Sequence, residues 1–184
     1  MRQTLGKVKT MFNVFFKTTT GVLLSFCTAT LNADVIDTFE VGTGESTSSL
    51  LFQFTNGNQY LYEVSYSGDL TGREAFDVIS GAQPDFFIPD ISVFSFGESL
   101  TGLEIGSDSD SGFGTPPDFL DYWHYWIRDS DLEPWDFASF GFSDRNLSDG
   151  SWDGWVFGSE FAPVPGSGSV LALIGLSAVR RRRG

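Results

Sequence analysis

Short apolar runs recur from Leu50 to Phe157 at a spacing of roughly 10 residues, which is typical of strands in small all-β domains. Gly, Asp, Ser, Asn and Pro separate the runs, and helix-favouring residues are few. Asn56-Gly57, between the first two runs, predicts a hairpin. We therefore expect one all-β domain, a β-sandwich or a barrel-like fold, over residues 34–161. The expected strands are 50–54, 59–66, 74–79, 91–96, 100–105, 122–127, 137–142 and 152–157.

The distribution of charge divides the chain into three parts. Of its 184 residues, 24 are acidic and 11 are Lys or Arg, which gives a formal net charge of −13. All the acids lie between Asp34 and Glu160, and the only cations in that range are Arg73, Arg128 and Arg145. Such an acidic body repels phosphate, so we expect no nucleic-acid partner. One Cys and one His exclude a disulfide framework and a Cys-based or multi-histidine metal site.

Residues 1–33 have the pattern of a secretory signal peptide. A basic start precedes a short apolar core at 21–29, and Ala33 is a small residue just before the acidic body. The core is shorter than the roughly 20 apolar residues that a membrane-spanning helix needs. We therefore expect export through the Sec machinery and cleavage by signal peptidase after Ala33.

Two features of this segment leave alternatives open. The basic region is long, so either Met1 or Met11 is the natural start. Cys27 suggests a lipid anchor, although the bulky Phe26 stands where lipoprotein cleavage boxes carry a small residue. A buried N-terminal helix or strand is the remaining alternative.

The C-terminal part, residues 162–184, combines a proline motif, an apolar run and an arginine cluster. Even with the Gly/Ser stretch before it, the run at 170–179 reaches only about 20 Å as a helix. The hydrocarbon core of a bilayer is about 30 Å thick. The arginines stay on the cytoplasmic side by the positive-inside rule. We therefore expect a short apolar helix that engages the membrane transiently, with an ordinary short anchor as the alternative.

This tail resembles the PEP-CTERM sorting signal of Gram-negative envelope proteins. In that family a Val-Pro-Glu-Pro motif precedes a Leu/Gly/Ala-rich segment and an Arg cluster, whereas here Ala162 and Val164 replace the Val and the Glu. The resemblance implies processing by an exosortase-type transpeptidase and a final location in the cell envelope, on the cell surface or in the extracellular matrix. The residues that carry it are Pro163, Pro165, Arg180, Arg181, Arg182 and Arg183.

A second, shorter resemblance covers residues 121–157. This stretch contains a Tyr-Trp-x-Tyr-Trp run at 122–126, Pro134-Trp135 and a final Trp-x-x-Trp at 152–155. It is similar to a module of secreted bacterial proteins that looks like the small β-grasp domain at the C-terminus of cobalamin carriers. The resemblance implies no particular ligand residues.

A calcium loop is one candidate site. Asp108 and Asp110 alternate with serines before Gly112, and Ca²⁺ prefers several oxygen ligands on such a turn. Asp118 and Asp121 are possible further ligands. The later acids of an EF-hand are missing, so a polar loop without metal is the alternative. We expect no other cofactor.

An aromatic platform is the second candidate. Trp152 and Trp155 are flanked by Asp and Gly residues, so we expect them to be the partly exposed pair that stacks on a ligand. The alternative for every tryptophan is core packing, which aromatic residues dominate in small domains. The five tryptophans are Trp123, Trp126, Trp135, Trp152 and Trp155.

The sequence singles out no catalytic residue. His124 is the only candidate for the histidine base of a serine triad, there is no Gly-x-Ser-x-Gly motif, and 24 acids make any one carboxylate pair arbitrary. We expect His124 to pack in or beside the sheet, and Arg145 to pair weakly with a nearby acid.

Three functions are compatible with this reading. The first is an exported, surface-sorted protein without catalytic activity, kept soluble by its negative charge. The second is an extracellular module that binds a glycan or a small ligand, which an apolar pocket with convergent polar groups would favour. The third is a secreted hydrolase, which needs a pocket with two carboxylates, one of raised pKa.

Overall fold

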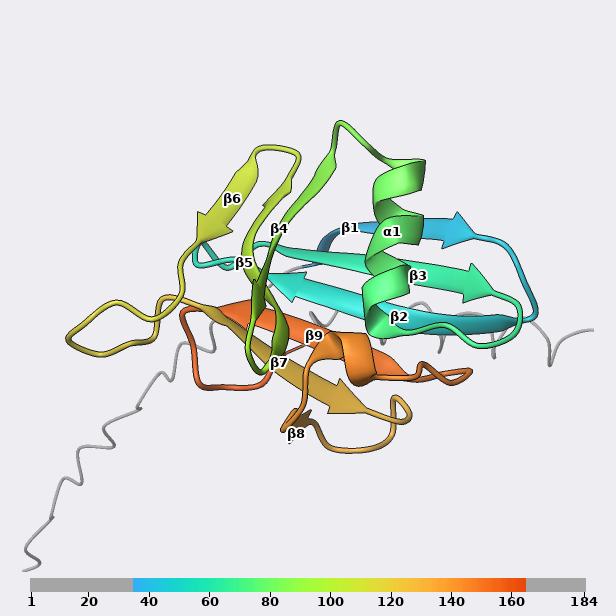
Figure 1. Cartoon of the computed structure of the whole chain (residues 1–184). Helices are drawn as coiled ribbons and strands as arrows, with labels where there is room; N and C mark the ends of the chain where they lie inside the picture. The colour runs from blue at the N-terminus through green and yellow to red at the C-terminus, as the bar shows by residue number, and fades with distance from the viewer. Residues whose placement is uncertain (1–34, 165–184) are drawn as a thin grey trace, which may run out of the picture. The chain divides into compact units, whose positions relative to one another are not determined.

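The computed structural model describes residues 35–164, which form two β-sheets and a single α-helix (Figure 1). The predicted, mostly β body is therefore confirmed. The helix α1 spans Gly72–Ala82, and a short 3₁₀ helix, η1, spans Phe142–Asp144. The strands are β1 (Val35–Gly42), β2 (Ser46–Gln53), β3 (Gln59–Tyr66), β4 (Phe87–Phe94), β5 (Gly97–Ile105), β6 (Asp108–Ser111), β7 (Trp123–Arg128), β8 (Asp136–Phe137) and β9 (Trp152–Phe157).

Six strands form the larger sheet, in the order β1-β3-β2-β9-β7-β8. β2 and β3 make the predicted hairpin, with Gln53 opposite Gln59. β9 is parallel to β2 and antiparallel to β7, so the last of the described strands joins the two halves of the sheet. β1 runs parallel to β3 along the outer edge.

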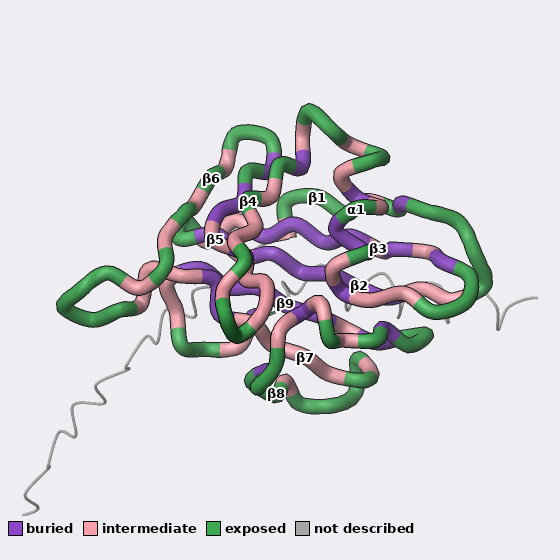
Figure 2. The backbone as a smooth tube through the Cα atoms, viewed as in Figure 1, coloured by how far each residue is buried: buried purple, intermediate pink, exposed green. Residues whose placement is uncertain are grey.

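The second layer consists of α1 and the antiparallel sheet β4-β5-β6, which lie over one face of the larger sheet (Figure 1). Buried residues run along β2, β3 and β9, and Figure 2 shows them in purple. Side chains on a strand alternate between faces, so Tyr60, Tyr62, Val64 and Tyr66 of β3 all point into the space between the layers.

Aromatic rings fill this core. The ring of Phe52 lies 5.1 Å from that of Trp155, 5.5 Å from Phe76 and 5.4 Å from Phe87, measured between centroids. These four residues come from β2, β9, α1 and β4. Edge-to-face and stacked ring pairs each add about 0.5–1.5 kcal/mol beyond the burial of area. One cluster of rings therefore holds both layers together.

The predicted strand at 74–79 is wrong, because these residues belong to α1. Thr71 caps the helix: its Oγ1 accepts from the Glu74 backbone N at 3.2 Å, and the Glu74 carboxylate accepts from the Thr71 backbone N at 2.8 Å. This reciprocal capping box satisfies donors that a first helical turn leaves free. Ala75, Phe76 and Ile79 then lie on one buried face at helical spacing.

The predicted strand at 137–142 is also mostly wrong. Of this range only Phe137 lies in a strand, the two-residue β8, which pairs with β7. The chain then turns into η1, where Phe142 packs on Phe76 of α1 at 5.0 Å between ring centroids. β1 and β6 were not expected as strands, because both are short of apolar alternation.

Several predicted segments lie outside the described residues. These are the signal peptide at 1–33 with its two possible starts, the apolar C-terminal helix, Pro165 and Arg180–Arg183. Within residues 35–164, the helix is too short and too polar to cross a bilayer. Residues 121–157 contain β7, β8 and β9, which belong to the larger sheet.

The capping box predicts a specific loss of stability. Thr71→Ala removes the side-chain acceptor for the Glu74 N–H, and such a change costs roughly 1 kcal/mol. We expect the free energy of unfolding, measured with urea, to fall by about that amount. Thr71→Ser keeps the hydroxyl and serves as the control. Equal losses in the two variants would contradict the capping role.

Candidate functional site

A cleft of about 670 Å³ opens between the smaller sheet and the β7 end of the larger sheet. Its walls come from the β4–β5 turn, from β5, from the loop after β6, and from the segment between β8 and η1. Ligand sites in proteins are typically clefts of roughly 300–1,000 Å³ lined by hydrophobic side chains. By size and position the cleft is the strongest candidate site among the described residues.

The floor of the cleft is the aromatic core itself. Leu100, Trp123, Phe142 and Trp155 line it and are all buried. Tyr125 also lines it, with its ring stacked 4.7 Å from that of Trp155. A floor made of close-packed core residues is rigid, so its shape does not depend on a bound ligand.

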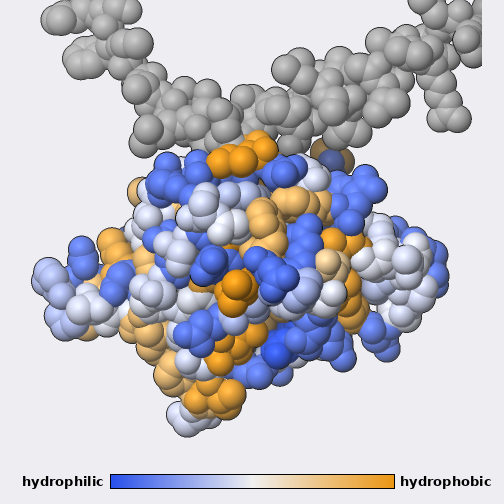
Figure 3. All heavy atoms as spheres, turned by 90° about the horizontal axis from the view of Figure 1, so that it is seen from above, coloured by the Kyte–Doolittle hydropathy of each residue, from blue (hydrophilic) through white to orange (hydrophobic). Residues whose placement is uncertain are grey.

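The rim carries phenylalanines that are 41–70% exposed. Figure 3 shows hydrophobic residues (orange) gathered at the lower edge of the view, among hydrophilic ones (blue). Contiguous exposed apolar surface on a soluble domain marks an interaction site or a ligand-binding groove. The five rim residues are Phe96, Phe113, Phe119, Phe137 and Phe140.

Local contacts hold two of these rings in place. Phe113 stacks on Phe94 with centroids 4.3 Å apart, and Phe94 stacks on Phe96 at 5.1 Å. The ends of the loop after β6 meet at Gly112, where a Cβ atom would lie 2.3 Å from the Asp121 carbonyl oxygen. Only glycine allows this approach. The rim is therefore built by the fold rather than by a chance exposure of side chains.

Two of the polar side chains that line the cleft are engaged within the protein. The Glu98 carboxylate accepts from the Ser143 hydroxyl and lies 3.8 Å from Nε of Arg73. The Tyr125 hydroxyl donates to Oδ2 of Asp153 at 2.5 Å. Glu98 is the one carboxylate among the described lining residues. The cleft therefore offers a ligand a mainly aromatic surface, and the buried Nε1 of Trp123, which has no hydrogen-bond partner among the described residues, is a free donor in its lining.

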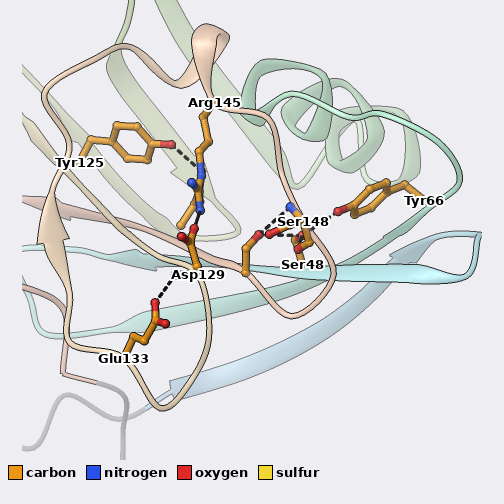
Figure 4. A network of polar contacts seen from close by, with 9 residues as sticks. Ser48, Tyr66, Tyr125, Asp129, Glu133, Arg145 and Ser148 are labelled. Carbon is orange, nitrogen blue, oxygen red and sulfur yellow. Dashed lines mark hydrogen bonds and ion pairs between the residues drawn. The ribbon is translucent and has the colours of Figure 1, made fainter.

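Asp153 lies beside this floor, two residues before Trp155 on β9, is fully buried, and was not singled out from the sequence. Burial raises its pKa to about 6, although the hydrogen bond from Tyr125 and the nearby Arg145 guanidinium favour its charged form. Nε of Arg145 lies 3.4 Å from Asp153, and its Nη2 lies 2.8 Å from Asp129 (Figure 4). Arg145 thus pairs with acids as predicted, but one partner is buried.

The predicted calcium residues lie on a strand instead of a loop. Asp108 accepts from Asn56, Asn58 and Tyr60, at 2.7–2.8 Å. Asp110 accepts from the backbone and hydroxyl of Thr55, at 2.8 and 2.9 Å. Partial burial alone would raise the pKa of Asp108, but the three hydrogen bonds outweigh it and lower that pKa. The two carboxylates fasten β6 to the β2–β3 hairpin.

The other possible calcium ligands point to no shared site. Asp121 accepts from the backbone and hydroxyl of Thr115, and Asp118 is exposed. Within residues 35–164, no three acidic, His or Cys side chains come together as metal ligands. Calcium binding stays a prediction, and the carboxylates of Asp108, Asp110 and Asp121 accept hydrogen bonds from the protein itself.

The two tryptophans proposed as a stacking pair lie on opposite faces of β9. Trp155 is 1% exposed and stacks between Phe52 and Tyr125, so the prediction that it is partly exposed is wrong. Trp152 is half-buried on the other face, where the Arg128 guanidinium lies 4.4 Å from its ring centroid. They are three positions apart along the strand, and side chains on a strand alternate faces at every residue, so an odd offset puts them on opposite faces.

His124 is buried in β7, as expected for a residue that packs within the sheet. Its ring stacks on Tyr122 at 3.8 Å, and burial lowers its pKa. It is not among the residues that line the cleft.

Comparison with models of known protein families and with curated proteins gave no match.

The buried carboxylate predicts a particular pH dependence. Since the pKa of Asp153 is raised to about 6, the folded state binds more protons than the unfolded state between about pH 4 and pH 6. The free energy of unfolding therefore falls as pH rises through that window. We expect Asp153→Asn to remove this fall, so that the variant gains about 3 kcal/mol on the wild type between pH 4 and pH 7.

Urea unfolding across this pH range measures the effect. Asp77→Asn, at a largely exposed carboxylate paired with Arg73, is the control and should follow the wild-type curve. If wild type and Asp153→Asn respond to pH in parallel, the raised pKa is wrong.

Proposed function

We propose that this chain is an exported protein whose body binds a small, largely apolar organic ligand in the aromatic cleft. The observation that carries the proposal is the combination of a cleft of about 670 Å³, a buried aromatic floor and a rim of exposed phenylalanines. Preformed apolar concavities of this size are the usual form of small-molecule sites.

The lining favours an apolar ligand over a glycan. Sugar binding needs hydrogen-bond partners for many hydroxyls, and unpaired polar groups are costly to bury. Here Glu98 and Tyr125 are already engaged within the protein. A flat aromatic or branched hydrocarbon with one or two polar groups fits the lining best. A single lining carboxylate also gives little support to the hydrolase alternative.

Export and sorting belong to the same proposal. They are supported by the signal-peptide pattern of residues 1–33 and by the resemblance of residues 162–184 to the PEP-CTERM signal. The acidic body, with only three cations between Asp34 and Glu160, suits a protein that stays dispersed outside the cell. In this proposal an exosortase-type enzyme removes the tail, and the ligand is bound at the cell surface or in the matrix.

Binding is tested with N-phenyl-1-naphthylamine, a neutral aromatic probe whose fluorescence rises in apolar sites. We expect saturable binding by the folded protein and weaker binding, by about tenfold, when Phe113→Ala or Phe140→Ala removes a rim ring. Both side chains are substantially exposed, so their loss should leave the fold intact.

The matched control is Phe161→Ala, which removes an exposed phenylalanine that does not line the cleft. It should bind the probe as the wild type does. Equal weakening in all three variants, or binding of oligosaccharides instead of the probe, would contradict an apolar site in the cleft.

Sorting is tested by the intact mass of the protein from its native host, with medium and envelope fractions analysed separately. We expect both ends to be missing, near Ala33 and near Pro163–Pro165. A protein in the membrane fraction that still carries its arginine tail would overturn the sorting proposal and leave a plain anchor.

A further inference from the structure

The face of the larger sheet that points away from the core is crossed by the last described residues of the chain. Strand pairing places Gly154 beside Leu51 and Trp126, and Val156 beside Gln53 and His124. Because strands alternate faces, these residues lie opposite the side of Trp155 and the core. Residues 161–164, which begin the proline motif, lie against this second face.

Pro163 is buried at this position. A Cβ atom on Gly154 would lie 2.7 Å from Cγ of Pro163 and 3.1 Å from Cη2 of Trp135. The absence of a side chain on Gly154 therefore creates the space in which the proline ring sits beside the indole. Aromatic grooves that receive a proline are a recurrent way of binding extended segments.

A buried glutamine holds the next residue. Nε2 of Gln59 donates to the Val164 carbonyl oxygen at 2.9 Å and to Oε1 of Gln53 at 2.7 Å. Gln59 is fully buried. If the segment left, the buried Gln59 amide would lose this acceptor, and leaving a buried donor unpaired costs free energy. The hydrogen bond therefore stabilises the docked segment.

The indole that contacts the proline is itself braced. The Arg128 guanidinium lies 4.5 Å from the ring centroid of Trp135 and 4.4 Å from that of Trp152. Nη1 of Arg128 also donates to the Asp131 carbonyl at 3.1 Å. Cation–π contacts on both sides fix the guanidinium, and through it the position of Trp135.

We propose that the second face is a docking site for the chain's own segment 161–164, and that the tail is cut only after this segment leaves the sheet. The proposal rests on the tail processing set out above. A protease or transpeptidase binds its substrate as an extended strand with free side chains, and Pro163 cannot be buried against Gly154 and be bound in that way. The body thus controls access to its own sorting motif.

Docking is tested on the full chain by chymotrypsin cleavage between Phe161 and Ala162. The Phe161 side chain is 81% exposed, but the enzyme must also bind Ala162 and Pro163. We expect slow cleavage in the wild type, because the rate follows the population of molecules in which the segment has left the sheet. In Gly154→Ala the added methyl group displaces the proline, so we expect cleavage to be about tenfold faster.

Pro163→Ala is the second variant, since it weakens docking without changing the sheet. Val164→Ala is the control, because the Val164 side chain is exposed. Gly81→Ala controls for an added methyl group, since no atom lies within 4 Å of a Cβ there. Cleavage at Phe161 that is equally fast in the wild type and all variants would overturn the docking.

Processing in the native host separates this proposal from the sorting proposal. If docking of segment 161–164 limits the access of the processing enzyme, Gly154→Ala should lose its tail several-fold faster than the wild type and Gly81→Ala. Suppose that chymotrypsin shows docking but all variants lose their tails at the same rate. The docking of segment 161–164 would then stand, and only the proposal that it controls tail processing would be overturned. If no variant loses its tail, the sorting proposal fails, and with it the control of access, while the chymotrypsin result still decides the docking.

Discussion

The stack of Phe52, Trp155 and Tyr125 is the contact on which the rest of the structure depends. It places three rings, from β2, β9 and β7, in register across the centre of the larger sheet. α1 and β4 contribute Phe76 and Phe87 to the same cluster. Without this stack the second layer would lose the centre of the surface on which it packs, and the cleft would lose part of its floor. The same rings therefore serve both stability and shape.

Charge plays a secondary and local part. Among the described residues the three arginines are each held by neighbours: Arg73 by Asp77, Arg145 by Asp129 and Asp153, and Arg128 between two indoles. Most of the acids have no cation near them. Exposed ion pairs contribute little in any case, so the fold depends on aromatic packing and on carboxylates that accept hydrogen bonds, such as Asp108.

The alternation of apolar and polar residues correctly predicted the strands in which it is regular. The predicted ranges 59–66 and 152–157 coincide with β3 and β9, and the hairpin at Asn56-Gly57 was also predictable. The helix was missed because Phe76, Val78 and Ile79 favour strands, although Thr71 and Glu74 carry a capping-box signal.

β1 and the cleft could not have been found in the same way. β1 is an exposed, acidic edge strand that exists through its parallel pairing with β3. The rim phenylalanines come from three separate segments, and only the tertiary structure brings them together. Asp153 looked like one of many surface acids. Its place two residues before Trp155 on the same strand is the one signal that it points inward.

The position of β9 has a consequence for how the body reaches its folded state. This strand lies between β2 and β7, yet it is the last of the described strands to be synthesised. Until residue 157 is available, β1-β3-β2 and β7-β8 have no strand to join them. Completing the sheet requires closure of a loop of about 100 residues, which makes folding slow and late. The larger sheet can therefore be completed only after residue 157 has been synthesised.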